Sequence, residues 1–165
     1  MQRPYNILVL CTGNSARSIL AEVLINTLGA GRFKAYSAGS HPTGRVNPFA
    51  VEQVRALGYP VDGLRSKSWD EFARADSPQM DFIVTVCDNA AGEVCPLWPG
   101  WPVTAHWGFP DPATVAGSDE VKRAAFGLTL WQVRNRVQLF LSLPLETLDR
   151  MAIENRMRAI GQEPL

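Results

Sequence analysis

A cysteine and an arginine separated by five residues, Cys11 and Arg17, are the pair whose spacing points most directly to chemistry. A β-like stretch precedes them and a helix-like stretch follows, so the run between them forms a loop at a helix N-terminus. Loop amides and a helix N-terminus direct positive charge at a bound anion, and the planar guanidinium fits two anion oxygens. The motif therefore predicts a site for a tetrahedral oxyanion. The loop that would bind it is Thr12, Gly13, Asn14, Ser15, Ala16 and Arg17.

Cys11 is the candidate nucleophile of this loop. The same positive field is expected to lower the pKa of its thiol and to favour a thiolate near neutral pH. Gly13 allows close backbone approach, Asn14 tolerates the left-handed conformation, and the Ser18 hydroxyl can donate to the thiolate. The alternative is a buried structural cysteine beside an unrelated arginine, which the strand-loop-helix context disfavours.

Asp111, followed by Pro112, is the candidate general acid. Attack on a tetrahedral oxyanion expels an oxygen, which a nearby carboxylic acid can protonate. The proline restricts the loop that carries the acid. An isolated Asp-Pro pair is more often an ordinary turn, and only the oxyanion loop elsewhere in the chain favours the catalytic interpretation.

Cys87 and Cys95 are the remaining cysteines, and they lie eight residues apart. Their spacing is neither the CxxC redox motif nor a familiar zinc pattern. Cys87 follows a predicted strand, and a flexible loop would let one thiol approach the other or Cys11 for thiol–disulfide exchange. Two inert thiols are the alternative.

The composition excludes several classes of protein. Lys plus Arg and Asp plus Glu both number 16, so the formal charge is zero, and this argues against nucleic-acid binding. The apolar stretches are too short for a membrane span, and the N-terminus does not resemble a secretory signal. Three cysteines fit a reducing cytoplasm, where they are catalytic or redox-active more often than structural.

Strand-like and helix-like segments alternate, which predicts an α/β fold with a parallel sheet covered by helices. Parallel strands carry their ligands at the carboxyl edge, so Cys11 and Cys87 are expected at one rim. Ser118 is the expected cap of the longest helix, and Pro144 breaks it. The predicted strands are 6–10, 33–37, 82–86 and 103–106; the predicted helices are 19–28, 48–57, 69–74, a long one after Ser118, and 145–160, which ends at Gly161.

The chain resembles the low-molecular-weight protein tyrosine phosphatase superfamily and, within it, the arsenate reductases. The likeness covers about residues 7–141. It implies one three-layer domain over 1–143, with a four-stranded parallel sheet and helices on both faces, and a C-terminal helix in 144–165 that packs on or extends from it. The resemblance rests on Cys11 to Ser18 with Ala21 and Glu22, on Ser37-Ala38-Gly39, on the Cys87 to Pro96 run, and on Asp111-Pro112.

The resemblance also implies roles. Cys11 is the nucleophile, Arg17 the oxyanion clamp and Asp111 the general acid, while Asn14 and Ser18 order the loop and the thiolate. Three residues match positions that help to bind a potassium ion in some members: Asn14, Glu22 and Ser37.

Two departures from the phosphatases favour arsenate reduction. Ala113 follows Pro112 where the phosphatases usually have tyrosine, and the phosphatases lack the pair Cys87 and Cys95. The expected relay runs from Cys11 to Cys87 and then to Cys95. The two loop cysteines are slightly closer in thioredoxin-coupled reductases, so thioredoxin, glutathione with glutaredoxin, and a mycothiol-type route all remain open as electron donors.

The expectation is therefore a cytoplasmic, monomeric arsenate reductase for arsenic detoxification. It would need no tightly bound cofactor beyond a possible potassium ion. Phosphate or sulfate would mimic arsenate, and thioredoxin or glutaredoxin would be the partner. A phosphatase acting on phosphotyrosine is the first alternative, and a non-catalytic oxyanion-binding protein is the second.

Overall fold

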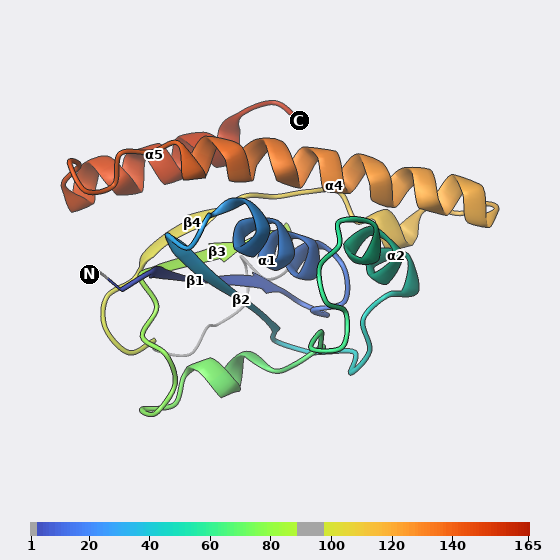
Figure 1. The fold of residues 1–165 in the computed structure, drawn as a ribbon, viewed down its shortest axis with the longest axis horizontal. Coiled ribbons are helices and arrows are strands. Elements are labelled where there is room, and N and C mark those ends of the chain that lie inside the picture. Colours follow the sequence, from blue (N-terminus) through green and yellow to red (C-terminus); the bar gives the residue numbers. More distant parts are fainter. Residues whose placement is uncertain (1–2, 89–97) are drawn as a thin grey trace.

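A computed structural model describes residues 3–88 and 98–165 of the chain. Its centre is a parallel sheet of four strands in the order β2-β1-β3-β4 (Figure 1). The strands are β1 (Tyr5–Cys11), β2 (Phe33–Gly39), β3 (Phe82–Thr85) and β4 (Val103–His106). The predicted α/β class and the four parallel strands are confirmed.

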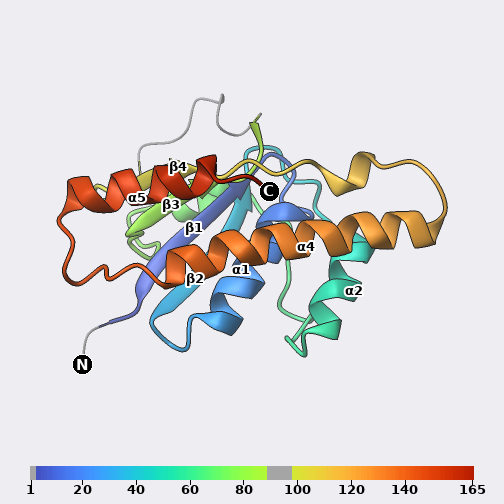
Figure 2. The same cartoon turned by 90° about the horizontal axis from the view of Figure 1, so that it is seen from above.

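Helices cover the two faces of the sheet unequally. One face packs against α1 (Arg17–Leu28), α4 (Asp119–Leu141) and α5 (Arg150–Gln162), which Figure 2 shows lying across the strands. The other face packs against the short 3-10 helix η1 (Trp69–Phe72). The helix α2 (Pro48–Ala56) packs beside α1 and α4.

The alternation of side chains along β1 assigns them to these two layers. Ile7, Val9 and Cys11 belong to the core shared with α1, α4 and α5, whereas Leu8 and Leu10 belong to the core beneath η1. Successive side chains of a strand point to opposite faces, so both sides of β1 are buried and its sequence is continuously apolar from Ile7 to Cys11.

The strand order reverses direction at β1, because β2 lies on one side of it and β3 on the other. Such a switch point opens a crevice at the carboxyl ends of the strands. Cys11 ends β1, and Cys87 follows β3 by two residues. The amide of Val86 donates to the Leu10 carbonyl at 2.9 Å, which extends the pairing up to these two cysteines.

Most predicted elements are confirmed within one or two residues. Asn47 caps α2 by accepting from the Phe49 amide, and Ser118 caps α4 by accepting from the Val121 amide. A 3-10 helix, η2 (Pro112–Thr114), follows Asp111. Helix 69–74 is the shorter 3-10 helix η1, and the start of the predicted final helix is wrong.

The final helix begins at Arg150, not at residue 145. Turns occupy the segment before it, with the Thr147 amide bonded to the Pro144 carbonyl, and Asp149 provides the cap by accepting from the Ala152 amide. The predicted stop at Gly161 is also wrong, because the helix continues through that residue. Gly161 instead permits contact with β4, since a Cβ there would collide with the His106 carbonyl oxygen.

Replacing Gly161 with alanine is expected to destabilise the fold by about 1–3 kcal/mol, the usual cost of overpacking. Helix propensity alone would make the alanine variant more stable by about 1 kcal/mol. A lower free energy of unfolding in Gly161→Ala would therefore indicate that the added Cβ collides with β4. Gly127, inside α4, is the matched control, because the nearest atom to its added Cβ is 3.9 Å away. Urea unfolding should show Gly127→Ala neutral or stabilised. Equal behaviour of the two variants would contradict the close packing of α5 on β4.

Within the described residues, no helix combines the length and apolar composition needed to cross a bilayer.

Candidate active site

The segment from Thr12 to Ala16 connects β1 to α1, and its carbonyl groups are held from outside the loop. The carbonyl oxygens of Thr12, Gly13 and Ser15 each accept a backbone amide from the segment 41–47, at 2.8–3.1 Å. Gly39 runs so close beneath the loop that a Cβ there would collide with the Thr12 carbonyl oxygen. The backbone of neighbouring segments therefore holds the carbonyl groups of the loop in place.

The N-terminus of α1 differs from those of the other long helices. Its N-cap, Ala16, offers no capping side chain, and no acidic residue lies in its first turn. The caps of α2, α4 and α5 are side chains of Asn47, Ser118 and Asp149. The first amides of a helix lack partners within the helix, so an uncapped N-terminus suits an anion.

Asn14 is a buried residue of the loop whose side chain is hydrogen-bonded on both sides. It has a φ of +46°, in the left-handed region that asparagine tolerates, as the sequence predicts. Its side-chain amide donates to the Ser18 hydroxyl oxygen at 2.8 Å, and its side-chain oxygen accepts the Lys67 amide at 2.9 Å. Because Ser18 accepts this bond, its own proton remains available to another acceptor.

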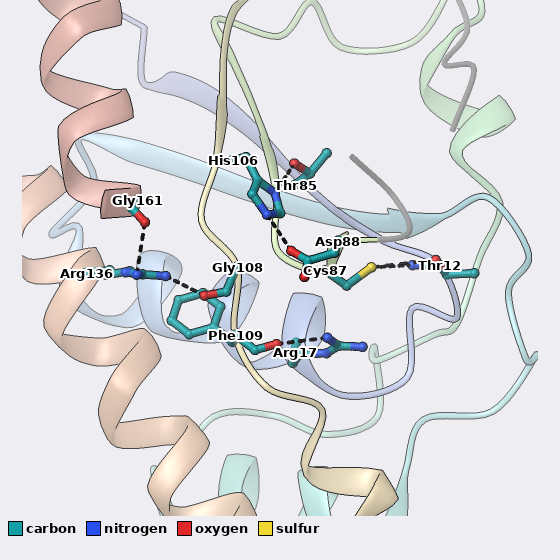
Figure 3. Close-up of polar contacts among 10 residues, drawn as sticks. All are labelled: Thr12, Arg17, Thr85, Cys87, Asp88, His106, Gly108, Phe109, Arg136 and Gly161. Atoms are coloured by element: carbon teal, nitrogen blue, oxygen red, sulfur yellow. Dashed lines mark hydrogen bonds and ion pairs between the residues drawn. The ribbon is translucent and has the colours of Figure 1, made fainter. Parts of the chain in front are cut away.

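Arg17 and Asp111 meet at the mouth of the loop. A guanidinium nitrogen of Arg17 lies 3.5 Å from an Asp111 carboxylate oxygen. The other terminal nitrogen donates to the Phe109 carbonyl at 3.0 Å, as Figure 3 shows. Asp111 also caps η2 by accepting the Ala113 amide at 3.0 Å. The structure therefore brings together two of the residues singled out from the sequence, ninety-four positions apart.

Cys11 and Cys87 are also brought together, and both are buried, with 6% and 3% of their surfaces exposed. The Cys87 sulfur accepts the Thr12 amide at 3.3 Å and lies 3.6 Å from the Thr12 hydroxyl (Figure 3). Cys87 lies close enough to Cys11 to be the largest influence on the pKa of the Cys11 thiol. Cys95 lies outside the described residues.

The expectation of a lowered Cys11 pKa is wrong for this arrangement. The hydrogen bond with Cys87 raises the pKa of Cys11 most, burial raises it further, and the opposing charge of Arg17 does not compensate. The guanidinium is also engaged by Phe109 and Asp111. The sequence predicted Arg17 and Cys87 near Cys11, but it did not predict that Cys87 raises the pKa of the Cys11 thiol.

A polar group beside Cys87 was not predicted. His106 is half-exposed rather than packed, and its ring nitrogens lie 2.8 Å from the Thr85 hydroxyl and 2.9 Å from an Asp88 carboxylate oxygen. Asp88 follows Cys87 directly in the chain, so this group fixes the position at which the chain leaves β3 (Figure 3). The other histidine, His41, is exposed.

Arg136 of α4 is a second residue that sequence reasoning missed. Its guanidinium donates to the Gly108 carbonyl at 2.6 Å and lies 4.7 Å from the centre of the Phe109 ring. Burial lowers the pKa of this guanidinium from its usual value. The sequence did contain a signal for this residue. Arg136 follows the buried Val133 by three positions, and that spacing puts its charge on the apolar face of the helix.

Two of the residues matched to a potassium site lie within hydrogen-bonding distance of each other. The Ser37 hydroxyl donates to a Glu22 carboxylate oxygen at 3.4 Å. Asn14 is linked to the same region through Lys67.

A family model described as low molecular weight phosphotyrosine protein phosphatase matches residues 6–151. An arsenate reductase of Halalkalibacterium halodurans is 37% identical over 134 residues, which are 81% of this chain and 93% of that protein. An arsenate reductase of Bacillus subtilis is 36% identical over the same shares. A solved structure of an arsenate reductase in the phosphate binding state has a TM-score of 0.58 at 28% identity, covering 81% of this chain and 97% of that chain.

The parallel sheet, the loop between β1 and α1 and the family match agree, and the chain belongs to the low molecular weight phosphotyrosine protein phosphatase family. Within that family its relatives include the arsenate reductases of the two bacteria named above.

Proposed function

We propose that this protein reduces arsenate to arsenite, as part of arsenic detoxification, and that Cys11 and Cys87 supply the two electrons. The observation that carries the proposal is a second buried thiol beside the nucleophile: the Cys87 sulfur accepts the amide of Thr12, the residue that directly follows Cys11. Simple phosphate-ester hydrolysis needs one thiol there, whereas reduction needs two. The arsenate reductases among the relatives support this choice.

The first step forms a bond between sulfur and arsenic. The amides of residues 13–17 and the N-terminus of α1 hold the oxyanion, and Arg17 turns from Asp111 to two of its oxygens. The Cys11 thiolate attacks arsenic, and a hydroxyl leaves as water after Asp111 protonates it. The product is an arsenic(V) ester of Cys11.

Ionisation of Cys11 follows from the arrival of the anion. The oxyanion is a base, so the proton released by the Cys11 thiol passes to an arsenate oxygen or to solvent as the complex forms. Cys87 and burial both raise the pKa of Cys11, so the thiol gives up its proton as the attack on arsenic begins.

The second step transfers the electrons. The Cys87 thiolate attacks the Cys11 sulfur, the bond between sulfur and arsenic breaks, and its electron pair leaves with arsenic. Arsenic(V) becomes arsenic(III), released as arsenite, and a disulfide between Cys11 and Cys87 forms. Both sulfurs lose one electron, which balances the two gained by arsenic.

The third step regenerates Cys11. Cys95 attacks Cys87, so that Cys11 is released as a thiol and a disulfide between Cys87 and Cys95 is formed. An external dithiol or two equivalents of a monothiol then reduce this disulfide. Thioredoxin is the donor that suits an internal relay, and glutathione with glutaredoxin is the alternative.

A single turnover tests the proposal. Reduced, desalted protein is mixed with excess arsenate in the absence of any other thiol, and arsenite is counted per chain. The relay predicts about one arsenite per chain, because each chain can form one disulfide that releases arsenite. Arsenite that appears only after glutathione is added would assign the second step to an external thiol. No arsenite under either condition would overturn the proposal.

A phosphatase is the second candidate, favoured by the family match and by the contact between Arg17 and Asp111. Both activities use the same loop, nucleophile and acid, so slow hydrolysis of an aryl phosphate is expected in either case. A kcat/KM for arsenate with thiol donor that greatly exceeds kcat/KM for aryl phosphates would favour the reductase. The reverse ratio would favour the phosphatase.

A further inference from the structure

Lys67 is a buried lysine directly behind the oxyanion loop, with 9% of its surface exposed. Its ammonium donates to the Arg65 carbonyl at 3.1 Å. Lysine is almost never this buried without an opposite charge. The carboxylate with the largest effect on Lys67 is the half-buried Glu22 of α1, which accepts the Ser37 hydroxyl.

Glu22 and Lys67 are each other's electrostatic partners. Burial raises the pKa of Glu22, and the charge of Lys67 opposes that rise most strongly. Burial lowers the pKa of Lys67, and the charge of Glu22 opposes that fall most strongly. The other charges felt by Lys67 are Arg65 and Glu71, which form an ion pair at 2.8 Å. The described charges around Lys67 therefore balance without an added ion.

Lys67 is also attached to the loop through its backbone. Its amide donates to the side-chain oxygen of Asn14 at 2.9 Å, and its carbonyl accepts the Gly39 amide at 2.9 Å. The preceding Ser66 hydroxyl donates to the Gly13 carbonyl at 2.9 Å. A displacement of Lys67 would therefore reach Asn14, whose left-handed backbone shapes the loop.

A potassium ion would have to share these residues with a buried lysine. The Asn14 side-chain oxygen accepts the Lys67 amide, and the Ser37 hydroxyl donates to Glu22, so only the remaining lone pairs of these oxygens could face a cation. An added cation would also compete with the Lys67 ammonium, the largest charge effect on the Glu22 carboxylate. Like charges in a site of low dielectric repel strongly.

We propose that the ammonium of Lys67 is a built-in cation that stabilises the oxyanion loop from behind, so that this chain needs no potassium ion at the site formed by Asn14, Glu22 and Ser37. Lys67 is a positioning residue, because it acts through Asn14 and Glu22 and does not touch the oxyanion. The proposal rests on the oxyanion-binding role proposed above for the loop.

Chemical rescue by potassium tests this proposal. Lys67→Ala removes the ammonium, leaves space, and leaves Glu22 with oxygen donors of the kind that hard cations prefer. Phosphate affinity is measured by calorimetry in potassium chloride and in choline chloride of equal ionic strength. The wild type should bind phosphate equally in both salts. Lys67→Ala should bind roughly tenfold more weakly in choline chloride and recover in potassium chloride, as expected for two coupled sites.

Two matched variants separate charge from packing. Lys67→Met removes the charge but fills the space, so its loss of phosphate affinity should not recover in potassium. Glu22→Gln combined with Lys67→Met removes both charges, and it should bind phosphate nearly as the wild type does in either salt. A Lys67 that only fills space would leave Lys67→Met like the wild type in both salts.

Two results would overturn the proposal. One is a wild type whose phosphate affinity rises specifically with potassium. The other is a Lys67→Ala loss that is equal in both salts. The melting temperature is recorded in the same salts, so that a variant too unstable to bind phosphate still reports whether potassium stabilises it. If the wild type binds neither phosphate nor arsenate, the oxyanion role fails, while potassium-dependent melting of Lys67→Ala would still support the built-in cation.

Discussion

Replacing Cys11 with serine is expected to abolish arsenate reduction, with a loss of roughly 10⁴-fold or more in turnover, as for other catalytic nucleophiles. A serine hydroxyl ionises far above neutral pH and cannot form a disulfide. Both the attack on arsenic and the electron transfer therefore fail in the variant. Arsenite release in the presence of excess thiol donor is the measurement.

The control for Cys11→Ser is the affinity for phosphate. The loop carbonyls are held by the segment 41–47 and Asn14 is held by Ser18 and Lys67, so the loop does not depend on the sulfur for its shape. Phosphate should bind the variant within a fewfold of the wild type. Arsenite release at the wild-type rate would rule out Cys11 as the nucleophile.

Replacing Cys87 with serine is expected to eliminate arsenite release in the single-turnover experiment, while hydrolysis of an aryl phosphate continues. The variant keeps Cys11, Arg17 and Asp111, so attack and protonation of the leaving group are unchanged. It lacks the thiol that must attack the Cys11 sulfur, so the arsenic ester cannot be resolved within the chain. This result would separate the two functions that share the loop.

Cys95→Ser is the matched control for Cys87→Ser. It should still release about one arsenite per chain and then stop with a disulfide between Cys11 and Cys87, visible by mass spectrometry of the unreduced protein. Full multiple turnover by Cys87→Ser with thioredoxin would contradict the internal relay. Loss of both arsenite release and aryl phosphate hydrolysis would indicate that Cys87 is needed for the shape of the site instead.

Local signals in the sequence predicted the sheet and much of the site. β1 and β3 are short, mostly apolar runs, and the cap Ser118 acts on an amide three residues away. The approach of Cys11 to Cys87 followed from topology, because both end strands of one parallel sheet. Predictions of this kind depend on a few neighbouring residues or on the general rule for parallel sheets.

Features that depend on contacts between distant segments were not predictable in this way. The rise in the pKa of Cys11 requires the Cys87 thiol, seventy-six residues away, and the place of Gly161 requires the backbone of β4. For His106 and Arg136, the sequence indicates only a strand end and a helical position. Their hydrogen bonds to Asp88 and to the Gly108 carbonyl become apparent only in the structure. The roles given to the site residues, and the relay through Cys95, stay predictions for the experiments above.

Arg136 ties the last residues of the chain to the reaction site. Besides the Gly108 carbonyl, its guanidinium binds the carbonyl oxygens of Gly161 and Glu163, at 3.1 and 2.9 Å. The neighbouring Phe109 carbonyl in turn holds Arg17. One side chain thus holds both the end of α5 and the segment that positions Arg17, so fraying of the final helical turn is expected to weaken the proposed oxyanion site.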